Sequence, residues 1–575
     1  MKITATTHGP AEAALAAILA ASAARLTGAG ADAIEVMATA PHHAHAFAIR
    51  VIAGDGADTA LEAVARVLAE IAPLRRLSVR PPRIYADAED RWFVDTVGRA
   101  VTTDPATYGD AAPTDRRPTL VMMFSNPNTN KPLHLGHLRQ NVVGMALSRM
   151  YEAIGWDVRR ADMLGDWGIH ICQALLGYLR WGDEIGTASS ALKGDHFAGR
   201  CLVRFHEENT AQRAATGDEG PTELETAARE LLLAATQGDR DTLRLKRRFT
   251  RWVESGLDET HARIGTSFDA VVRESHARLR ACRMFQGGLT SGVFQRRDDG
   301  SVHGDLTSVG LWDVTLFRRD STSTAYVQHA GPEDELFERY GCDRLLFVYG
   351  PDWVAPHKVS KELYRRLDLP WQDRIEGLSH GLVSLPEGRM RSRSGTVLNV
   401  DLLLDEIASS LAASWERQPR ESGGTTTEAT CEQLAVALLK LAFLRVPRRL
   451  DITFDPTRLQ RDVIPQLAAL LAADDALAAG PVGGGEPGGI GPSRHANYFP
   501  TVVARAAAAA DPADLVRFTV RCAEAARAAA SRLPEEARIQ FRVVLRRALQ
   551  LLNIDLPLGT ADLPPSLTLR ARPAG

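Results

Sequence analysis

The sequence lacks the features that would point to an exported, membrane-bound or disulfide-linked protein. Its six cysteines are scattered over 575 residues without any C-x-x-C pair, so we expect reduced thiols in a cytoplasmic protein. It has no signal-type amino terminus and no long uninterrupted apolar segment, and we therefore expect neither export nor membrane spanning. The formal net charge of −3 argues against a protein that coats nucleic acid with a uniformly basic surface.

Lysine is scarce as well, because arginine supplies most of the basic residues. A lysine inside a motif is therefore informative. In other respects the composition, with 45% hydrophobic and 24% charged residues, is that of an ordinary globular protein. The length is sufficient for three or four domains.

The most informative stretch covers residues 119–144. Residues 120–124 form an apolar run that predicts a short buried strand, and residues 125–132 are rich in turn and cap residues. From Leu133 onward the spacing of the apolar residues becomes helical. The stretch therefore predicts a strand, a loop and a helix in that order.

Two histidines stand at the start of this predicted helix. His134 and His137 are three residues apart, so we expect both imidazoles on one face of the first turn. Free backbone N–H groups and the positive end of the helix dipole favour a phosphate there. Gly136 would let a flat ring or a ribose approach the backbone, and Lys131 adds a positive charge just before the helix. This set suits the negative charge that develops when a carboxylate attacks the α-phosphate of ATP.

Two other interpretations of the histidines are weaker. They could be capping or surface residues without a catalytic role, or they could bind zinc, which would need a third ligand nearby. The surrounding sequence S-N-P-N-T-N-K-P-L-H-L-G-H-L-R instead resembles the first signature motif of class I aminoacyl-tRNA synthetases, in the form found in arginyl-tRNA synthetases. The matching positions are Asn128, Lys131, His134, Gly136, His137 and Arg139.

A second match follows the next predicted strand, residues 156–163. Residues 165–168, G-D-W-G, resemble a tetrapeptide that the same family carries at this distance. Asp166 could accept a hydrogen bond from an amine or a hydroxyl, although an Asp-capped tight turn is the plain alternative. The resemblance implies a Rossmann-like nucleotide-binding domain, with ATP as a substrate and Mg²⁺ as its metal ion.

The family's second signature is recognisable in residues 387–407, E-G-R-M-R-S-R-S-G-T-V-L-N-V-D-L-L-L-D-E-I. The resemblance places Arg389, Arg391 and Arg393 on a loop where they could bind ATP and neutralise the departing pyrophosphate. The usual lysines of this loop are absent, so Lys131 would have to supply more of the positive charge. A solvated basic loop is the plain alternative.

The amino-acid pocket is where the sequence departs from the family. The resemblance keeps Asn128 on the polar side and Tyr326 on the lid side of the pocket. At the positions where the family has two acids and a glutamine, this chain has Met123, Ala330 and Trp353. A guanidinium would lose charge-assisted hydrogen bonds of about 1.5–3 kcal/mol each in such a pocket. We therefore expect a neutral or apolar amino acid and poor use of arginine.

An alignment error of one residue would change this expectation, because it turns the side chains of a strand to the opposite face. In that case nearby acids could still face a guanidinium. The candidates are Glu333, Asp334 and Asp352.

The expected fold is α/β with three parts. A small α/β domain covers residues 1–106, a Rossmann-like catalytic domain covers residues 119–423 with a helical insertion at about residues 174–300, and a helical domain covers residues 425–575. The helical domain resembles the family's anticodon-binding bundle, but residues 461–477 replace its aromatic-rich helix. Without those aromatics, unpaired anticodon bases lose stacking worth about 1–3 kcal/mol each.

These observations predict a ligase that forms an aminoacyl-adenylate from ATP and passes the aminoacyl group to the 3′ end of a tRNA. One alternative is an amide ligase that transfers the acyl group to a small amine. Another is a catalytically silent paralogue that binds tRNA. The expected partners are an amino acid, ATP and tRNA, and we expect a monomer.

Overall fold

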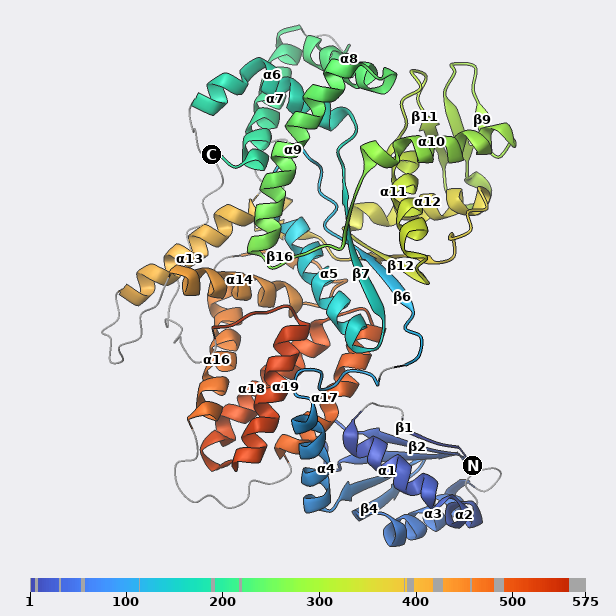
Figure 1. The fold of residues 1–575 in the computed structure, drawn as a ribbon, viewed down its shortest axis with the longest axis vertical. Coiled ribbons are helices and arrows are strands. Elements are labelled where there is room, and N and C mark those ends of the chain that lie inside the picture. The colour runs from blue at the N-terminus through green and yellow to red at the C-terminus, as the bar shows by residue number, and fades with distance from the viewer. Residues whose placement is uncertain are drawn as a thin grey trace.

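The structure is a computed structural model, and Figure 1 shows an elongated molecule with its amino-terminal α/β unit at one end. None of the helices in the described ranges is long and apolar enough to cross a bilayer. The structure describes residues 2–5, 9–29, 33–52, 57–112, 114–187, 192–216, 220–386, 388–389, 398–416, 428–455, 458–479 and 491–557.

The amino-terminal unit is a five-stranded sheet of order β1-β2-β3-β5-β4 that packs against helices. This unit is the small α/β domain that the sequence predicts, and Ser22 separates its first two helices. The strands are β1 (Lys2–Ala5), β2 (Ala33–Ala38), β3 (Phe47–Ile52), β4 (Leu74–Arg80) and β5 (Arg83–Ala88). The helices are α1 (Pro10–Ala21), α2 (Ala23–Gly28), α3 (Ala57–Ile71) and α4 (Asp90–Thr103).

The central sheet has the order β13-β12-β6-β7-β8, and all of its neighbouring strands are parallel. In such a sheet the carboxyl ends of the strands meet at one edge, where ligands bind. The predicted strand, loop and helix of the first motif are confirmed as β6 and α5. The elements are β6 (Thr119–Met123), α5 (Leu135–Ala153), β7 (Asp157–Leu164), β8 (Ala270–Arg273), β12 (Arg344–Tyr349) and β13 (Ile375–Ser379).

Alternation along β6 sends its side chains to two separate cores. Leu120 and Met122 belong to the core on the α5 side, whereas Val121 and Met123 belong to the core on the opposite face. Helices α10 (Glu274–Thr290), α11 (Ala325–Tyr340) and α12 (Val354–Arg366) supply that second core.

The chain between β7 and β8 is helical and lies at the top of Figure 1. The sequence predicts an insertion over about residues 174–300, but residues 270–273 form β8 of the central sheet and α10 packs on that sheet, so the helical segment is shorter than predicted. After α10, a three-stranded antiparallel sheet precedes α11. The insertion helices are α6 (Ile169–Thr187), α7 (Gly194–Thr216), α8 (Glu223–Gln237) and α9 (Arg240–Arg263). The small sheet consists of β9 (Gln295–Arg296), β10 (Val302–Asp305) and β11 (Asp313–Phe317).

The carboxy-terminal part is helical and lies between the central sheet and the amino-terminal unit (Figure 1). Residues 461–477 fall in a π-helical turn, Leu459–Val463, and in α16. The helices are α13 (Val400–Glu416), α14 (Glu428–Leu444), α16 (Ile464–Ala478), α17 (Gly491–Ala508), α18 (Ala513–Ala529) and α19 (Glu535–Leu551). Short strands β14 (Val383–Leu385), β15 (Gly388–Arg389) and β16 (Ile452–Thr453) join this part to the catalytic part.

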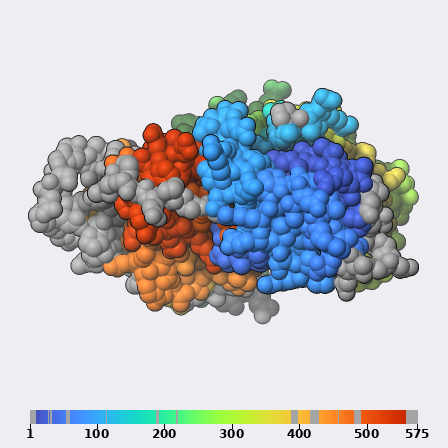
Figure 2. All heavy atoms as spheres, turned by 90° about the horizontal axis from the view of Figure 1, so that it is seen from below, coloured from blue at the N-terminus to red at the C-terminus, as the bar shows by residue number. Residues whose placement is uncertain are grey.

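Buried hydrogen bonds hold the amino-terminal unit against the bundle, and Figure 2 shows these two parts of the chain side by side. The Ala11 amide donates to Asn497 Oδ1 at 2.9 Å, and just after the unit the Tyr108 hydroxyl donates to the carbonyl of Ala496 at 2.8 Å. The bundle therefore links the amino-terminal unit to the rest of the molecule.

Candidate active site

The loop after β6 adopts a strained backbone that carries the first motif to the edge of the sheet. Ser125 and Asn126 have φ values of 77° and 49°, in the left-handed region that non-glycine residues rarely adopt. Asp162 on β7 holds the loop there, because its Oδ1 accepts from the Asn126 amide at 2.9 Å. Burial raises the pKa of Asp162 to about 8.

His134 and His137 meet at the amino terminus of α5, as their spacing predicts. His134 Nδ1 accepts from the Gly136 amide at 3.1 Å, and His137 Nδ1 accepts from the His134 amide at 3.3 Å. Their rings stack with centroids 3.9 Å apart. A Cβ at Gly136 would lie 2.9 Å from the His134 ring, so glycine leaves room for that ring.

The two imidazoles are neutral donors. Burial, together with the charge of Lys131, lowers the pKa of His134 to about 3, and burial lowers the pKa of His137 as well. Because Nδ1 accepts a hydrogen bond in each neutral ring, the proton must reside on Nε2. Capping therefore occupies one nitrogen of each ring and leaves the Nε2–H groups to donate to a phosphate.

Lys131 is one of seven lysines in the chain. Burial lowers its pKa to about 8, while the charge of Asp352 acts in the opposite direction. Arg139, which also matches the motif, is fully buried and donates to the carbonyls of Gly381 and Leu450 at 2.8 and 2.7 Å. Arg139 therefore holds α5 against the segments that precede β14 and β16.

Asn128 and Asp166 both lie where β7 ends. Asn128 Oδ1 is 3.2 Å from His170 Nε2, and a side chain at Gly165 would collide with it, since a Cβ would lie 2.2 Å away. Asp166 accepts from the backbone amide of Ser275 at 2.8 Å and also from its hydroxyl. The Asp166 carboxylate thus ties the end of β7 to α10.

The three residues that the resemblance predicts in the amino-acid pocket lie on one face of the sheet. Met123 and Ala330 are fully buried in the same apolar core, and Trp353 packs against that core. His329, adjacent to Ala330 on α11, stacks on Trp353 with ring centroids 4.2 Å apart. His329 Nε2 is also 3.6 Å from Glu274 Oε1.

Sequence reasoning did not single out His329 or assign Glu274 a role in the site. The available indications were the position of His329 beside Ala330 and the Glu274-Ser275 pair after β8. Burial lowers the pKa of His329 to about 4 and raises the pKa of Glu274 to about 8. Both side chains are therefore neutral at pH 7. Tyr326 lies in the first turn of α11 and is half-buried.

The alternative acids have different surroundings. The Asp334 carboxylate already has two partners, because it accepts from the Trp371 indole at 2.7 Å and pairs with Arg280 at 3.0 Å. Glu333 is buried, and burial raises its pKa to about 8. Asp352 is exposed.

The loop arginines of the second motif are only partly covered by the structure. Arg389 ends β15, and Arg391 and Arg393 lie outside the described residues. The ATP-binding role of these three arginines stays a prediction.

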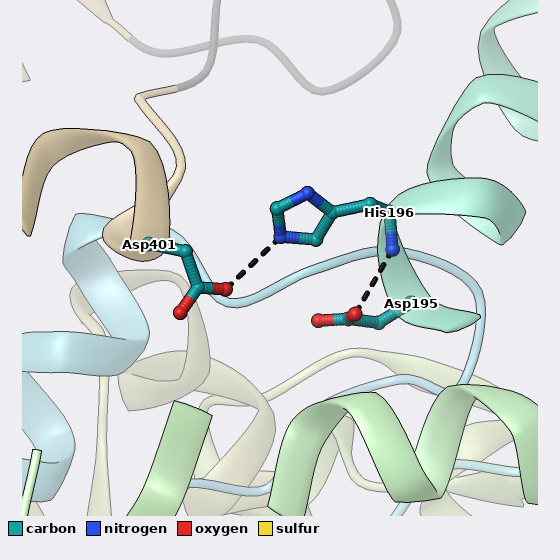
Figure 3. A group of neighbouring side chains, drawn as sticks. All are labelled: Asp195, His196 and Asp401. Atoms are coloured by element: carbon teal, nitrogen blue, oxygen red, sulfur yellow. Dashed lines mark hydrogen bonds and ion pairs between the residues drawn. The ribbon is translucent and has the colours of Figure 1, made fainter. Parts of the chain in front are cut away.

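One group of side chains has the spacing of a metal site, and Figure 3 shows it. Asp195, His196 and Asp401 each offer a ligand atom, and these atoms lie within 4.8 Å of one another. The Nζ of Lys193, however, is 2.6 Å from Asp401 Oδ2 and 3.3 Å from Asp195 Oδ2. A metal ion would therefore have to displace an ammonium group.

Comparison with known proteins adds three findings. A family model described as tRNA synthetases class I (R), catalytic domain, matches residues 103–455. Arginine--tRNA ligase of Bacteroides thetaiotaomicron is 34% identical over 359 residues, which are 61% of this chain and 60% of that protein. The corresponding protein of Amoebophilus asiaticus is 35% identical over 350 residues, 59% of each chain. The matched region thus spans about 60% of these relatives.

Solved structures show the same fold over most of the chain. Arginyl-tRNA synthetase of Thermus thermophilus matches with a TM-score of 0.69 at 17% identity and covers 94% of this chain and 99% of that one. The Plasmodium falciparum enzyme matches with a TM-score of 0.64 at 11% identity, covering 96% and 99%. The expected α/β fold with added helical parts is therefore confirmed.

Proposed function

The chain belongs to the class I (R) tRNA synthetases, and on that premise we propose that it joins an amino acid to ATP and then to the 3′ end of a tRNA. An oxygen of the amino-acid carboxylate attacks the α-phosphorus, and the bond to pyrophosphate breaks. A ribose hydroxyl of the tRNA then attacks the carbonyl of the adenylate, loses its proton, and AMP departs.

The observation that carries the proposal is the pair of Nε2–H donors at the start of α5. His134 and His137 are neutral and held by backbone amides, so they need no rearrangement to donate to the α-phosphate as its charge grows. Lys131 adds positive charge from the preceding loop.

Mg²⁺ would accompany the phosphates of ATP and neutralise part of their charge. Lys131 and the Nε2–H groups of His134 and His137 are hydrogen-bond donors, so this donor set fits phosphate oxygens and offers no ligand to a hard cation. The ion would therefore be held by ATP and water, as is common at phosphate sites.

For the amino acid, we propose a neutral or apolar side chain. Met123 and Ala330 offer no charge, and Trp353 is stacked on His329. Glu274 is the acid adjacent to this group, but it faces His329 and is protonated at pH 7. A cationic side chain would pair only with ionised Glu274, and removing the proton of Glu274 at pH 7 would cost about 1.4 kcal/mol of binding free energy.

The test is ATP–pyrophosphate exchange with each amino acid, with and without tRNA, followed by measurement of aminoacyl-tRNA. We expect exchange with at least one uncharged amino acid and a base-labile ester on tRNA. If exchange occurs without aminoacyl-tRNA, and an added amine is converted to an amide, the acceptor is a small amine and not tRNA. The absence of exchange under all conditions would refute adenylate formation.

A further inference from the structure

Lys193 lies in a cluster of buried charges between the helical insertion and α13. Besides its ion pairs with Asp195 and Asp401, its Nζ donates to the hydroxyl of Thr260 on α9. The side chain of Asp195 is fully buried, and those of Asp401 and Lys193 are 10% and 17% exposed. Buried carboxylates of this kind need a fixed positive partner.

The cluster has the geometry of a cation site. His196 Nε2 lies 3.0 Å from Asp401 Oδ2, and the His196 amide donates to Asp195 Oδ1 at 3.0 Å (Figure 3). A lysine ammonium is a compact point charge with three donors. Lys193 thus supplies from within the chain the charge that a metal ion would supply to these ligands.

Backbone contacts connect this cluster to the candidate active site. Asp401 lies in the first turn of α13, and Asn399 Oδ1 caps that helix by accepting from the Asp401 amide at 2.8 Å. Asn399 forms a backbone bridge with His134, and the Val400 amide donates to the carbonyl of Leu133 at 3.1 Å. The residues just before His134 therefore rest on the start of α13.

Two further contacts fix the start of α13 to the insertion. Arg263 on α9 donates to the backbone carbonyl of Asp401 at 3.1 Å, and Asn399 Nδ2 lies 3.0 Å from His196 Nε2. The helical insertion thus reaches the start of α5 through a short chain of polar contacts.

We propose that Lys193 is a built-in cation that pairs with the two carboxylates of a three-ligand site and, through Asp401 and Asn399, positions His134 for adenylate formation. The positioning part of this inference rests on the proposed function, whereas the cation site does not. Lys193 is a positioning residue in this account, since the contacts place it on Asp401 and not on His134.

The positioning role is tested with Lys193→Met, which removes the charge and retains most of the side-chain volume. We expect kcat of pyrophosphate exchange to fall at least tenfold while the KM for ATP changes less than threefold, because His134 acts in the transition state. Lys358→Met, at an exposed lysine on α12, is the matched control and should leave both constants unchanged.

A double-mutant cycle with His134→Ala shows whether the effect passes through His134. Lys193→Met should reduce kcat much less in the His134→Ala background than in the wild type. Equal losses in the two backgrounds would overturn positioning through His134, and so would wild-type kinetics of Lys193→Met.

The cation site is tested by its ability to accept a metal once the ammonium is gone. In Lys193→Ala, Zn²⁺ at micromolar concentration should raise the melting temperature, and this rise should be absent in the wild type and in Lys193→Ala, Asp401→Asn. If Lys193→Ala does not fold alone, recovery of the folded protein on refolding with Zn²⁺ is the same readout. If Zn²⁺ neither raises the melting temperature of Lys193→Ala nor restores its folding, the cation site is refuted. This result does not depend on whether the protein forms an adenylate.

Discussion

The two halves of the candidate active site differ in their polar groups. The nucleotide half lies at the start of α5, and the amino-acid half lies on the opposite face of β6. At the start of α5 lie two neutral imidazoles, which backbone amides hold in place, and Lys131 precedes them in the loop. On the opposite face of β6, Met123 and Ala330 lie in an apolar core, and beside it His329 Nε2 is 3.6 Å from Glu274 Oε1. This contrast underlies our proposals that the chain uses ATP and that its amino acid is not arginine.

The largest effect is expected in the nucleotide half. His134→Ala or His137→Ala should each lower the rate of adenylate formation by about 10²–10³-fold, because each removes a preorganised donor to the α-phosphate. Pyrophosphate exchange measures the rate, and circular dichroism checks the fold. Near-normal exchange rates in both variants would show that the two histidines only cap α5 and have no catalytic role.

Lys131 should have the next largest effect. Lys131→Ala is expected to lower kcat by about tenfold to a hundredfold and to change ATP affinity less, because the charge it stabilises grows in the transition state. Arg389→Ala and Arg393→Ala should each be milder, since neighbouring arginines share the role. If Lys131 is dispensable and the arginine variants are strongly impaired, the main positive charge is supplied by the arginine loop.

The pH dependence of kcat/KM tests whether the charge of Lys131 is needed. Burial lowers the pKa of Lys131 to about 8, so its charge is present below pH 8 and is lost as the pH rises above it. We expect kcat/KM to fall above pH 8 and this fall to move to higher pH in Lys131→Arg. An unshifted profile in Lys131→Arg would assign the titration to another group.

A further effect concerns stability, not rate, in the amino-acid half. Burial raises the pKa of Glu333 from 4.5 to about 8, so the folded state binds its proton more tightly than the unfolded state. Its contribution to stability is present below pH 4.5 and is lost as the pH rises to 8. The free energy of unfolding of the wild type should therefore fall relative to Glu333→Gln by about 3 kcal/mol between pH 5 and 8. Urea titrations measure it, and Glu335→Gln on the same helix is the control.

Local sequence patterns were sufficient for the backbone of the nucleotide half. The apolar run of β6 and the helical spacing after Leu133 are short-range features, so they predicted the strand, the loop and the helix start. Sequence could not show that Nδ1 of each histidine caps the helix, because that depends on ring orientation. Nor could it show that Arg139 is buried against Gly381, a residue 242 positions away in the chain.

The amino-acid half depends on contacts between distant segments, and sequence reasoning was correspondingly less complete there. It identified Met123, Ala330 and Trp353 through family resemblance, but the stacking of His329 on Trp353 and the approach of Glu274 require α10, α11 and the β12 end to be packed together. The Lys193 cluster joins residues more than 200 positions apart for the same reason.

The central claim is that the amino-acid pocket no longer suits arginine. The most direct test compares arginine with uncharged amino acids in pyrophosphate exchange, in the wild type and in the double variant Met123→Glu, Ala330→Asp. We predict that the wild type activates an uncharged amino acid and uses arginine poorly, and that arginine activation appears in the double variant. Efficient arginine activation by the wild type would contradict the account.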